Sequence, residues 1–180
     1  FKKTKGCNIW DVDGIKYTDM SYMGMGTNIL GYSNTKIDSC VKDVITKGNL
    51  STLNASEEVL LAEKLIKMNP WASQVKFTRS GGEANAVAVR LARSVSKNKS
   101  IAVCGHHGWH DWYLASNLNK ENNSISSLSP IGVPDQLKKT IYTFDYNDFE
   151  KLKYLIEEKQ IGIVKMEVSR IHKPKNNFLK

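Results

Sequence analysis

The stretch QVKFTRSGGEANAVAVRLARSVSKNKSIAVC, residues 74–104, decides the fold class. Its first residues, Gln74–Thr78, predict a short strand, and its last residues, Ser100–Cys104, predict a short apolar strand. A helix is expected between them over Glu83–Ser96, because its apolar residues recur at spacings of three and four: Ala84, Val87, Leu91 and Val95. A strand, a helix and a strand in this order indicate an α/β fold.

The C-terminal part of the sequence continues the alternation. We expect a strand over Thr140–Phe144, a helix over Asp148–Lys159 and a strand buried on both faces over Ile161–Val168. The helix has four apolar residues predicted to point inward: Phe149, Leu152, Leu155 and Ile156. The prediction is an α/β core with a mainly parallel sheet, in which ligands bind at the carboxyl ends of the strands.

The N-terminal part has hairpin and helix patterns. Asp13-Gly14 predicts a β-hairpin whose strands carry Ile9, Val12, Ile15 and Tyr17. A helix is expected over residues 37–45, with Gly48 as its stop. A second helix is predicted from a capped start at Ser56 to Asn69-Pro70.

The composition excludes several classes of protein. Of the 180 residues, 41% are hydrophobic and 24% are charged, as in globular proteins, and the net charge of +8 comes from scattered lysines rather than from a nucleic-acid-binding block. The sequence has neither a signal peptide nor a membrane-spanning run, so we expect a cytoplasmic protein. Three widely spaced cysteines, Cys7, Cys40 and Cys104, indicate buried thiols rather than disulfides. Phe1 and the apolar run IGIVKMEV near the end indicate a fragment of a longer chain.

The first candidate site residues are Ser80, Gly81 and Gly82, which open the central helix. The first amides of a helix have no intrahelical partner, and glycines let a ligand approach, so this turn could hold a phosphate or carboxylate. A tight turn at an ordinary helix start is the alternative. No Gly-Lys-Ser/Thr follows, and GMGTNILG near residue 24 lacks the dinucleotide spacing, so nucleoside triphosphates and NAD are disfavoured.

The second candidate turn is CGHHGWHDWY, residues 104–113. It contains three histidines and an aspartate: His106, His107, His110 and Asp111. These residue types bind zinc, but Gly108 interrupts the helix that such ligands need, so we predict no metal. Two readings remain open: an aromatic ring stacks on a planar ligand, or Trp109 and Trp112 merely pack in a polar turn.

The third candidate turn, MEVSRIHKP, follows the last predicted strand. Glu167 at the end of a buried strand needs a partner or solvent, and Arg170 could pair with it or bind a carboxylate. We expect the turns after Thr78, Cys104 and Met166 to converge in one pocket. The polar loop Asn117–Gln136 is long enough to be a lid.

Five segments together carry a resemblance to a known family: GCNIWDVDGIKYTDM, ILGYSN, FTRSGGEANAVAVRLAR, GHHGWHD and KMEVSR. In this order they closely resemble the class III aminotransferases, which are pyridoxal-phosphate (PLP) enzymes of fold type I. The branch similar to glutamate-1-semialdehyde aminomutase matches best. The resemblance implies PLP as cofactor, an amino donor and a carbonyl acceptor as substrates, and a homodimer. It also implies that residues 1–50 form part of a small domain and residues 51–180 the first part of the PLP-binding domain.

The resemblance also assigns cofactor-binding residues. Ser80, Gly81 and Gly82 match the phosphate cup, His107 matches the family's His-Gly, and His106 stands where a tyrosine usually stacks on the pyridine ring. Glu167 matches the acid of the usual Glu-Pro, although the next residue here is Val168.

The family's remaining catalytic groups have no match in the sequence. The aspartate that pairs with the pyridinium and the lysine that forms the Schiff base are expected beyond Lys180, and no lysine of the C-terminal region stands in a matching motif: Lys165, Lys173, Lys175 and Lys180. We therefore predict no catalytic residue within this chain, which alone should be inactive. Two other interpretations remain: a non-catalytic relative of the family, and a metal-dependent hydrolase built on the histidines.

Overall fold

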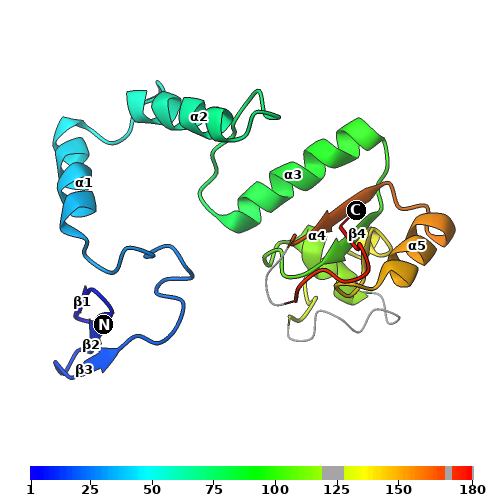
Figure 1. Ribbon diagram of the computed structural model, residues 1–180, viewed down its shortest axis with the longest axis horizontal. Helices are drawn as coiled ribbons and strands as arrows, with labels where there is room; N and C mark the ends of the chain where they lie inside the picture. The colour runs from blue at the N-terminus through cyan, green and yellow to red at the C-terminus, as the bar shows by residue number, and fades with distance from the viewer. Residues whose placement is uncertain (119–127, 169–171, 180) are drawn as a thin grey trace. The chain divides into compact units, whose positions relative to one another are not determined.

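The computed structural model describes residues 1–118, 128–168 and 172–179, and the chain divides into two compact units, Phe1–Val75 and Lys76–Lys180 (Figure 1). The elements of the first unit are β1 (Lys3–Lys5), β2 (Asn8–Trp10), β3 (Lys16–Thr18), α1 (Thr35–Lys47) and α2 (Ser56–Met68). The elements of the second unit are α3 (Gly81–Ser96), β4 (Ile101–Cys104), α4 (Asp111–Leu114), η1 (Ala115–Leu118), η2 (Asp135–Leu137), β5 (Ile141–Thr143), α5 (Phe149–Glu158) and β6 (Ile163–Met166).

The predicted hairpin is the pair β2 and β3, which is antiparallel with Ile9 opposite Tyr17. Asp11 closes the connecting loop, because its carboxylate accepts hydrogen bonds from the N–H groups of Asp13 and Ile15. The prediction that Val12 and Ile15 lie on the strands is wrong, because both belong to this loop and are exposed. Strand β1, which the sequence did not predict, pairs antiparallel with β2.

Helices α1 and α2 lie where the apolar spacing predicts them. Asn34 caps α1 by accepting hydrogen bonds from the N–H groups of Lys36 and Ile37, and Gly48 ends it with a φ of 94°, which favours glycine. The predicted cap of α2 is wrong: Ser56 is the first helical residue, and the N-cap is Ala55, which makes no side-chain hydrogen bond.

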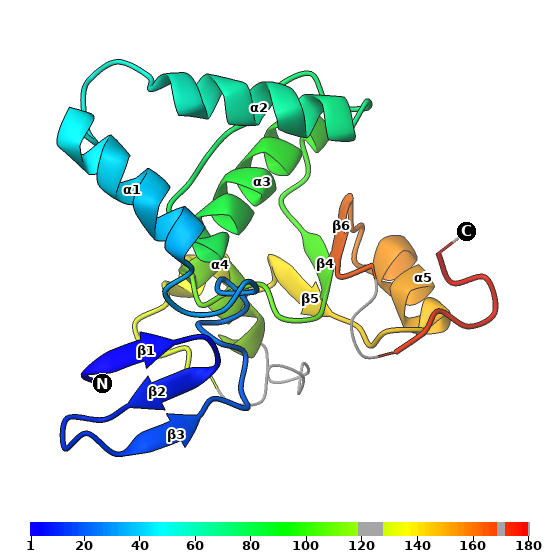
Figure 2. The ribbon, with the colours of Figure 1, turned by 60° about the vertical axis from the view of Figure 1, so that its left-hand side comes forward.

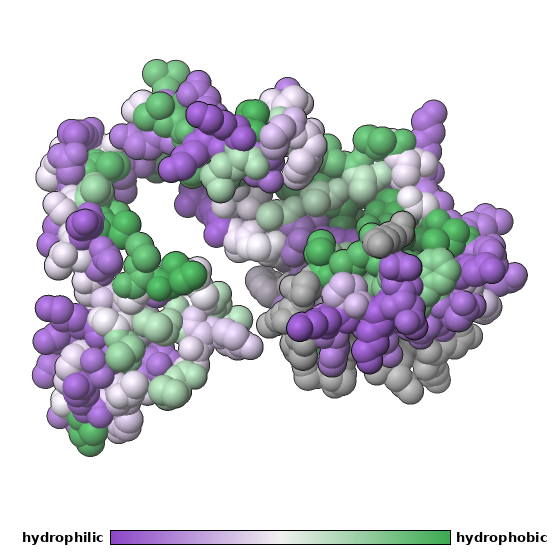
Figure 3. All heavy atoms as spheres, viewed as in Figure 1, coloured by the Kyte–Doolittle hydropathy of each residue, from purple (hydrophilic) through white to green (hydrophobic). Residues whose placement is uncertain are grey.

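No residue of the first unit is buried by the described part of the chain. Figure 3 shows apolar side chains at its surface among the hydrophilic ones. Cys7 and Cys40 are exposed, so the prediction of buried thiols is correct for Cys104 alone. Cys104 lies on strand β4 and packs with Leu155 of α5, whereas the described residues leave Cys7 and Cys40 exposed.

The second unit has a parallel sheet with the strand order β5-β4-β6. Alternation along β4 sends Ile101 and Val103 to one face, where they pack in a cluster with Val89 of α3. Ala102 and Cys104 face the other side and pack with Leu155 of α5. Helices α3 and α5 therefore cover opposite faces of the sheet (Figure 2), which is the predicted α/β arrangement.

Three details of this unit differ from the predictions. Gln74–Thr78 is not a strand, because none of the described residues pairs with it. Strand β6 is not buried on both faces: Val164 is 44% exposed, because β6 is an edge among the described strands. Phe149 and Ile156 of α5 are exposed, because the sheet covers only the side of the helix that carries Leu152 and Leu155.

The chain after β4 contains a short helical segment that the sequence did not predict. Helix α4 and the 3₁₀ turn η1 bury Trp112, Tyr113 and Ala115 in the same cluster as Ile101 and Val103. Residues 119–127 of the predicted lid lie outside the described residues, so the lid stays a prediction. Within the described part of the chain, every helix is too short or too polar to cross a lipid bilayer.

Candidate functional site

Two side chains cap the start of α3. Ser80 is the N-cap, and its hydroxyl accepts a hydrogen bond from the Glu83 N–H at 3.2 Å. The Glu83 carboxylate reaches back and accepts from the Arg79 N–H at 2.7 Å. The N–H groups of Gly81 and Gly82 donate to no atom of the residues that the structure describes, as expected for the first turn of a helix. Two amide donors at the positive end of the helix dipole are thus available to an anion.

The turn after β4 packs directly against this first turn. A Cβ atom placed on Gly108 would lie 3.2 Å from the Cα atom of Gly82, and the φ of Gly108 is 102°. A Cβ atom placed on Gly82 would lie 2.7 Å from the imidazole of His110. Gly108 is therefore required by close packing and by its backbone conformation, whereas Gly82 has a helical backbone and a Cβ atom there would press only on the His110 side chain.

His107 connects the turn to three elements of the unit. Its side chain is 4% exposed, and its Nε2 lies 2.9 Å from the carbonyl oxygen of Cys104 at the end of β4. Its Nδ1 lies 3.1 Å from the Nζ of Lys165 on β6. Its own carbonyl accepts a hydrogen bond of 3.0 Å from the Asn85 side chain on α3. This histidine thus fixes the turn relative to both strands and the helix.

Glu167 brings the third predicted turn to the same place. Its N–H donates to the carbonyl of Cys104 at 3.4 Å, and a Cβ atom on Gly105 would lie 3.1 Å from its Cγ. Gly105 has a φ of 94°, and its carbonyl accepts a hydrogen bond of 2.8 Å from the Tyr113 hydroxyl. The carboxyl ends of β4 and β6 therefore meet with their turns in contact.

Burial sets the protonation of the groups at these strand ends. Burial and the nearby charge of Lys165 lower the pKa of His107, so its neutral form is favoured. Burial also lowers the pKa of Lys165, while the Glu167 carboxylate raises it. Burial raises the pKa of the Tyr113 hydroxyl, so Tyr113 remains a hydrogen-bond donor at neutral pH.

The aromatic residues of the turn divide into buried and exposed rings. His106 is exposed, and its ring meets the buried Tyr113 edge to face at a centroid distance of 5.8 Å. Trp109 is 70% exposed and stacks on His110 at 5.0 Å, whereas Trp112 is buried. Both tryptophans thus contact neighbouring side chains, and stacking of a ring of this turn on a planar ligand stays a prediction. His106 presents a flat ring that is open to a ligand.

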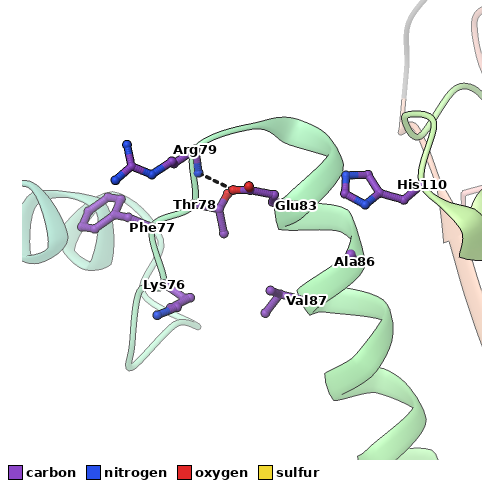
Figure 4. A pocket seen from close by; sticks show the side chains of 8 residues that line it. All are labelled: Lys76, Phe77, Thr78, Arg79, Glu83, Ala86, Val87 and His110. Atoms are coloured by element: carbon purple, nitrogen blue, oxygen red, sulfur yellow. Dashed lines mark hydrogen bonds between the residues drawn. The ribbon is translucent and has the colours of Figure 1, made fainter.

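A surface hollow of about 410 Å³ adjoins the start of α3 (Figure 4). One wall is the extended segment of residues 76–79, and the other is the first two turns of α3, with the His110 ring at the helix start. Lys76 and Arg79 bring two cationic side chains to this wall. The same lining includes the Glu83 carboxylate and the apolar side chains of Phe77 and Val87, so the hollow by itself does not favour an anionic ligand.

The predicted turns contact one another in pairs: Gly108 lies against Gly82, and Glu167 lies against Gly105. None of the six predicted cofactor-binding residues lines the hollow, so their convergence in one pocket stays a prediction. Arg170 lies outside the described residues. Within the described ranges, no group of three or more His, Cys, Asp or Glu side chains could hold a metal ion.

The sequence analysis missed three residues of this site: Asn85, His110 as the neighbour of Gly82, and Lys165 as the partner of His107. Lys165 had a visible signal, because it interrupts the apolar run IGIVKMEV. Asn85 had a weaker signal as a polar residue among the alanines and valines of α3.

The observed groups fit a planar ligand that carries a phosphate. The open space beside Gly81, where a Cβ atom would meet nothing within 4 Å, leaves room for an anion at the two amides. The exposed ring of His106 and the carboxylate of Glu167 lie on the adjoining turns, where a planar heterocycle could be stacked and its polar atoms contacted.

Comparison with known proteins gives consistent matches. A family model described as aminotransferase class-III matches residues 1–177. The 3-aminobutyryl-CoA aminotransferase of Cloacimonas acidaminovorans is 30% identical over 97% of this chain and 39% of its own length. The glutamate-1-semialdehyde 2,1-aminomutase of Methanobrevibacter smithii is 34% identical over 99% of this chain and 43% of its own length.

A solved transaminase with PLP bound has a TM-score of 0.84 at 24% identity, covering 98% of this chain and 43% of that one. The predicted fold class, that of the fold type I PLP-dependent transferases, is thereby confirmed. The chain spans about two fifths of the length of the curated relatives it matches.

Proposed function

Because the chain belongs to the class-III aminotransferase family, whose members use PLP, we propose that the protein containing it is a PLP-dependent enzyme that moves an amino group between an amino donor and a carbonyl acceptor. The observation that carries the proposal is the contact of the turn after β4 with the first turn of α3, where the amides of Gly81 and Gly82 donate to no described atom and the space beside Gly81 is open. An ordinary tight turn would not need the glycine contact between Gly82 and Gly108.

Each predicted residue then has a physical role. The amides of Gly81 and Gly82, with the Ser80 hydroxyl, hold the cofactor phosphate at the positive end of α3. His106 stacks on the cofactor ring as a flat but more polar substitute for the family's usual tyrosine. Glu167 contributes a negative charge beside the ring, and His107 keeps the turn that carries His106 in place.

The cofactor, when bound, supplies the electron sink for the reaction, and the protein supplies binding, orientation and charge. Neutral His107 avoids a second positive charge beside Lys165. Protonated Tyr113 holds the Gly105 carbonyl and so keeps Glu167 against the turn. These residues act by orienting the turn rather than by contact with the substrate.

An intramolecular amino transfer is the second candidate, favoured by the 34% identity to a glutamate-1-semialdehyde aminomutase. The two candidates differ in whether a separate carbonyl acceptor is consumed. Assaying the full-length protein with an amino donor, with and without an acceptor, distinguishes them, because an aminomutase forms product without the acceptor.

The remaining parts of the proposal concern the whole protein. We place it in the cytoplasm as a homodimer, with residues 1–50 in a small domain and residues 51–180 in the cofactor-binding domain. Sedimentation of the full-length protein tests the dimer, and a fully active monomer would contradict it.

Titration of the full-length protein with PLP tests the cofactor proposal. A Cβ atom placed on Gly81 would meet nothing within 4 Å, so Gly81→Val should keep the fold. Its branched side chain lies beside the free amide, so binding should weaken by more than about tenfold, or about 1.4 kcal/mol. Gly82→Val should weaken binding as strongly, but it also displaces His110.

The matched control for this titration is Ser56→Val, at the first position of α2, which should bind PLP like the unmodified protein. Unchanged affinity in Gly81→Val would mean that the turn is only a helix start.

A further inference from the structure

Lys165 occupies a position where strand β6 otherwise has an inward-facing apolar side chain. Residues two apart in a strand share a face, so Lys165 lies on the same face as Ile163. Ile163 packs against the cluster that contains Val89, Ile101 and Val103. An ammonium on this face is unfavourable unless it is hydrogen-bonded, so the partner of Lys165 is decisive.

The described partner is His107, and the geometry fits only one form of its ring. The Cys104 carbonyl can only accept a hydrogen bond, so the Nε2 that lies 2.9 Å away carries the proton. The Nδ1 is then an acceptor, and it faces the Lys165 ammonium, which has donors only, at 3.1 Å. In the other tautomer the Nδ1–H donor would face the Lys165 ammonium, which is also a donor. The unprotonated Nε2 acceptor would then face the Cys104 carbonyl oxygen, which is also an acceptor.

We propose that Lys165 is a positioning residue: its ammonium selects the neutral Nε2–H tautomer of His107 and thereby holds the turn of residues 105–108 against α3. The turn is joined to α3 by the Asn85 side chain, which donates to the His107 carbonyl at 3.0 Å, and by the Gly108 contact with Gly82. The consequence for the cofactor rests on the proposed function, because the same turn carries His106.

The surrounding charges act on His107 in opposing directions. Lys165 and His106 oppose its protonation, whereas Glu167 and the Cys104 carbonyl favour it. Two cations 3.1 Å apart repel each other strongly, so a charged Lys165 disfavours the imidazolium. Removing Lys165 should therefore change both the tautomer and the ease of protonation of His107.

The test is ¹⁵N NMR of the imidazole nitrogens in the histidine-labelled full-length protein, recorded as a function of pH without cofactor. In the unmodified protein we expect the neutral Nε2–H form of His107. In Lys165→Met, which keeps the length and loses the donor, we expect the Nε2–H to Nδ1–H ratio to fall at least about tenfold and protonation to begin at higher pH. Lys165→Arg, which keeps charge and donors, should restore the ratio.

A second measurement connects the tautomer to the site. PLP affinity should fall severalfold in Lys165→Met and recover in Lys165→Arg, while Lys153→Met, which removes an exposed lysine from α5, should change neither the spectrum nor the affinity. Should Lys165→Met fail to fold, Lys165→Leu takes its place, because it also removes the donor and the charge and is apolar like Ile163 on the same face.

The outcomes separate the two proposals. A His107 spectrum in Lys165→Met like that of the unmodified protein overturns the role of Lys165, and so does a changed spectrum with unchanged PLP affinity. An unmodified protein that binds no PLP overturns the proposed function, while the spectra still decide whether Lys165 sets the tautomer.

Discussion

The two units of the chain contain helices of similar length, but only one of them has a buried core. Helices α1 and α2 have 13 residues each and no buried residue, whereas α3 has 16 residues and buries Val89 against the sheet. Every buried hydrophobic residue of the described chain belongs to the second unit. The difference teaches that apolar spacing suffices to predict a helix, while burial of its apolar face needs a sheet or a second layer of structure.

Truncating a leucine in each unit should produce the largest contrast. Leu155 on α5 is 1% exposed and Leu60 on α2 is 63% exposed. Leu155→Ala should lower the free energy of unfolding by about 2–5 kcal/mol, because burial is lost and a cavity remains. Leu60→Ala should lower it by less than about 0.5 kcal/mol. Urea unfolding of the full-length protein measures both, and equal losses would show that another part of the protein covers α2.

A glycine in each unit provides the next contrast. Gly108 and Gly14 both have a positive φ, 102° and 87°, so alanine should strain either turn by about 1–3 kcal/mol. Only at Gly108 would the new Cβ press on another backbone, 3.2 Å from the Cα of Gly82. Gly108→Ala should therefore destabilise the protein by about 1 kcal/mol more than Gly14→Ala in thermal or urea unfolding. Equal effects would mean that the turn and α3 separate easily.

The two units should also lose stability in different pH ranges. The pKa of His107 is lowered by burial, so the unfolded chain binds a proton that the native state refuses. The stability of the second unit should therefore fall as the pH drops below about 6.5, by at most about 1.4 kcal/mol per pH unit from this group.

In the first unit, hydrogen bonds from Ser21 and Tyr32 lower the pKa of Asp19. Its contribution is present above the ordinary pKa of 3.8 and is lost as the pH falls through the lower value of the folded state. Unfolding of the unmodified protein, measured at a series of pH values, should show a loss of stability below about pH 6.5 and a second loss below pH 3.8. His107→Gln should lack the first loss. A loss near pH 6.5 that persists in His107→Gln would contradict the assignment.

The smallest effects are expected at the helix caps. Ser80→Ala removes the cap of α3 and should cost about 1 kcal/mol of stability, because α3 packs on the core. Asn34→Ala removes the cap of α1 and should cost less than about 0.5 kcal/mol in global unfolding, because α1 can fray while the core persists. Hydrogen exchange should nevertheless show faster exchange throughout α1. A larger global loss for Asn34→Ala would reverse the comparison.

The sequence alone predicted most of the helices and strands of the core and their order along the chain. Helical spacing predicted α1, α2, α3 and α5 to within a few residues, and apolar runs predicted β4, β5 and β6. These features depend on residues only a few positions apart in the sequence, so they can be predicted from one segment at a time. The same reasoning placed Ser80, Gly81 and Gly82 at a helix start, because caps are local.

Only the tertiary structure decided which side chains meet. The contact of Lys165 with His107 joins residues 58 positions apart, and the approach of Gly108 to Gly82 depends on how a loop lies over a helix. Gln74–Thr78 shows the limit most clearly: its residues suit a strand, but a strand exists only when another one pairs with it. Pairing, burial and side-chain partners are properties of distant segments brought together, and no local pattern encodes them.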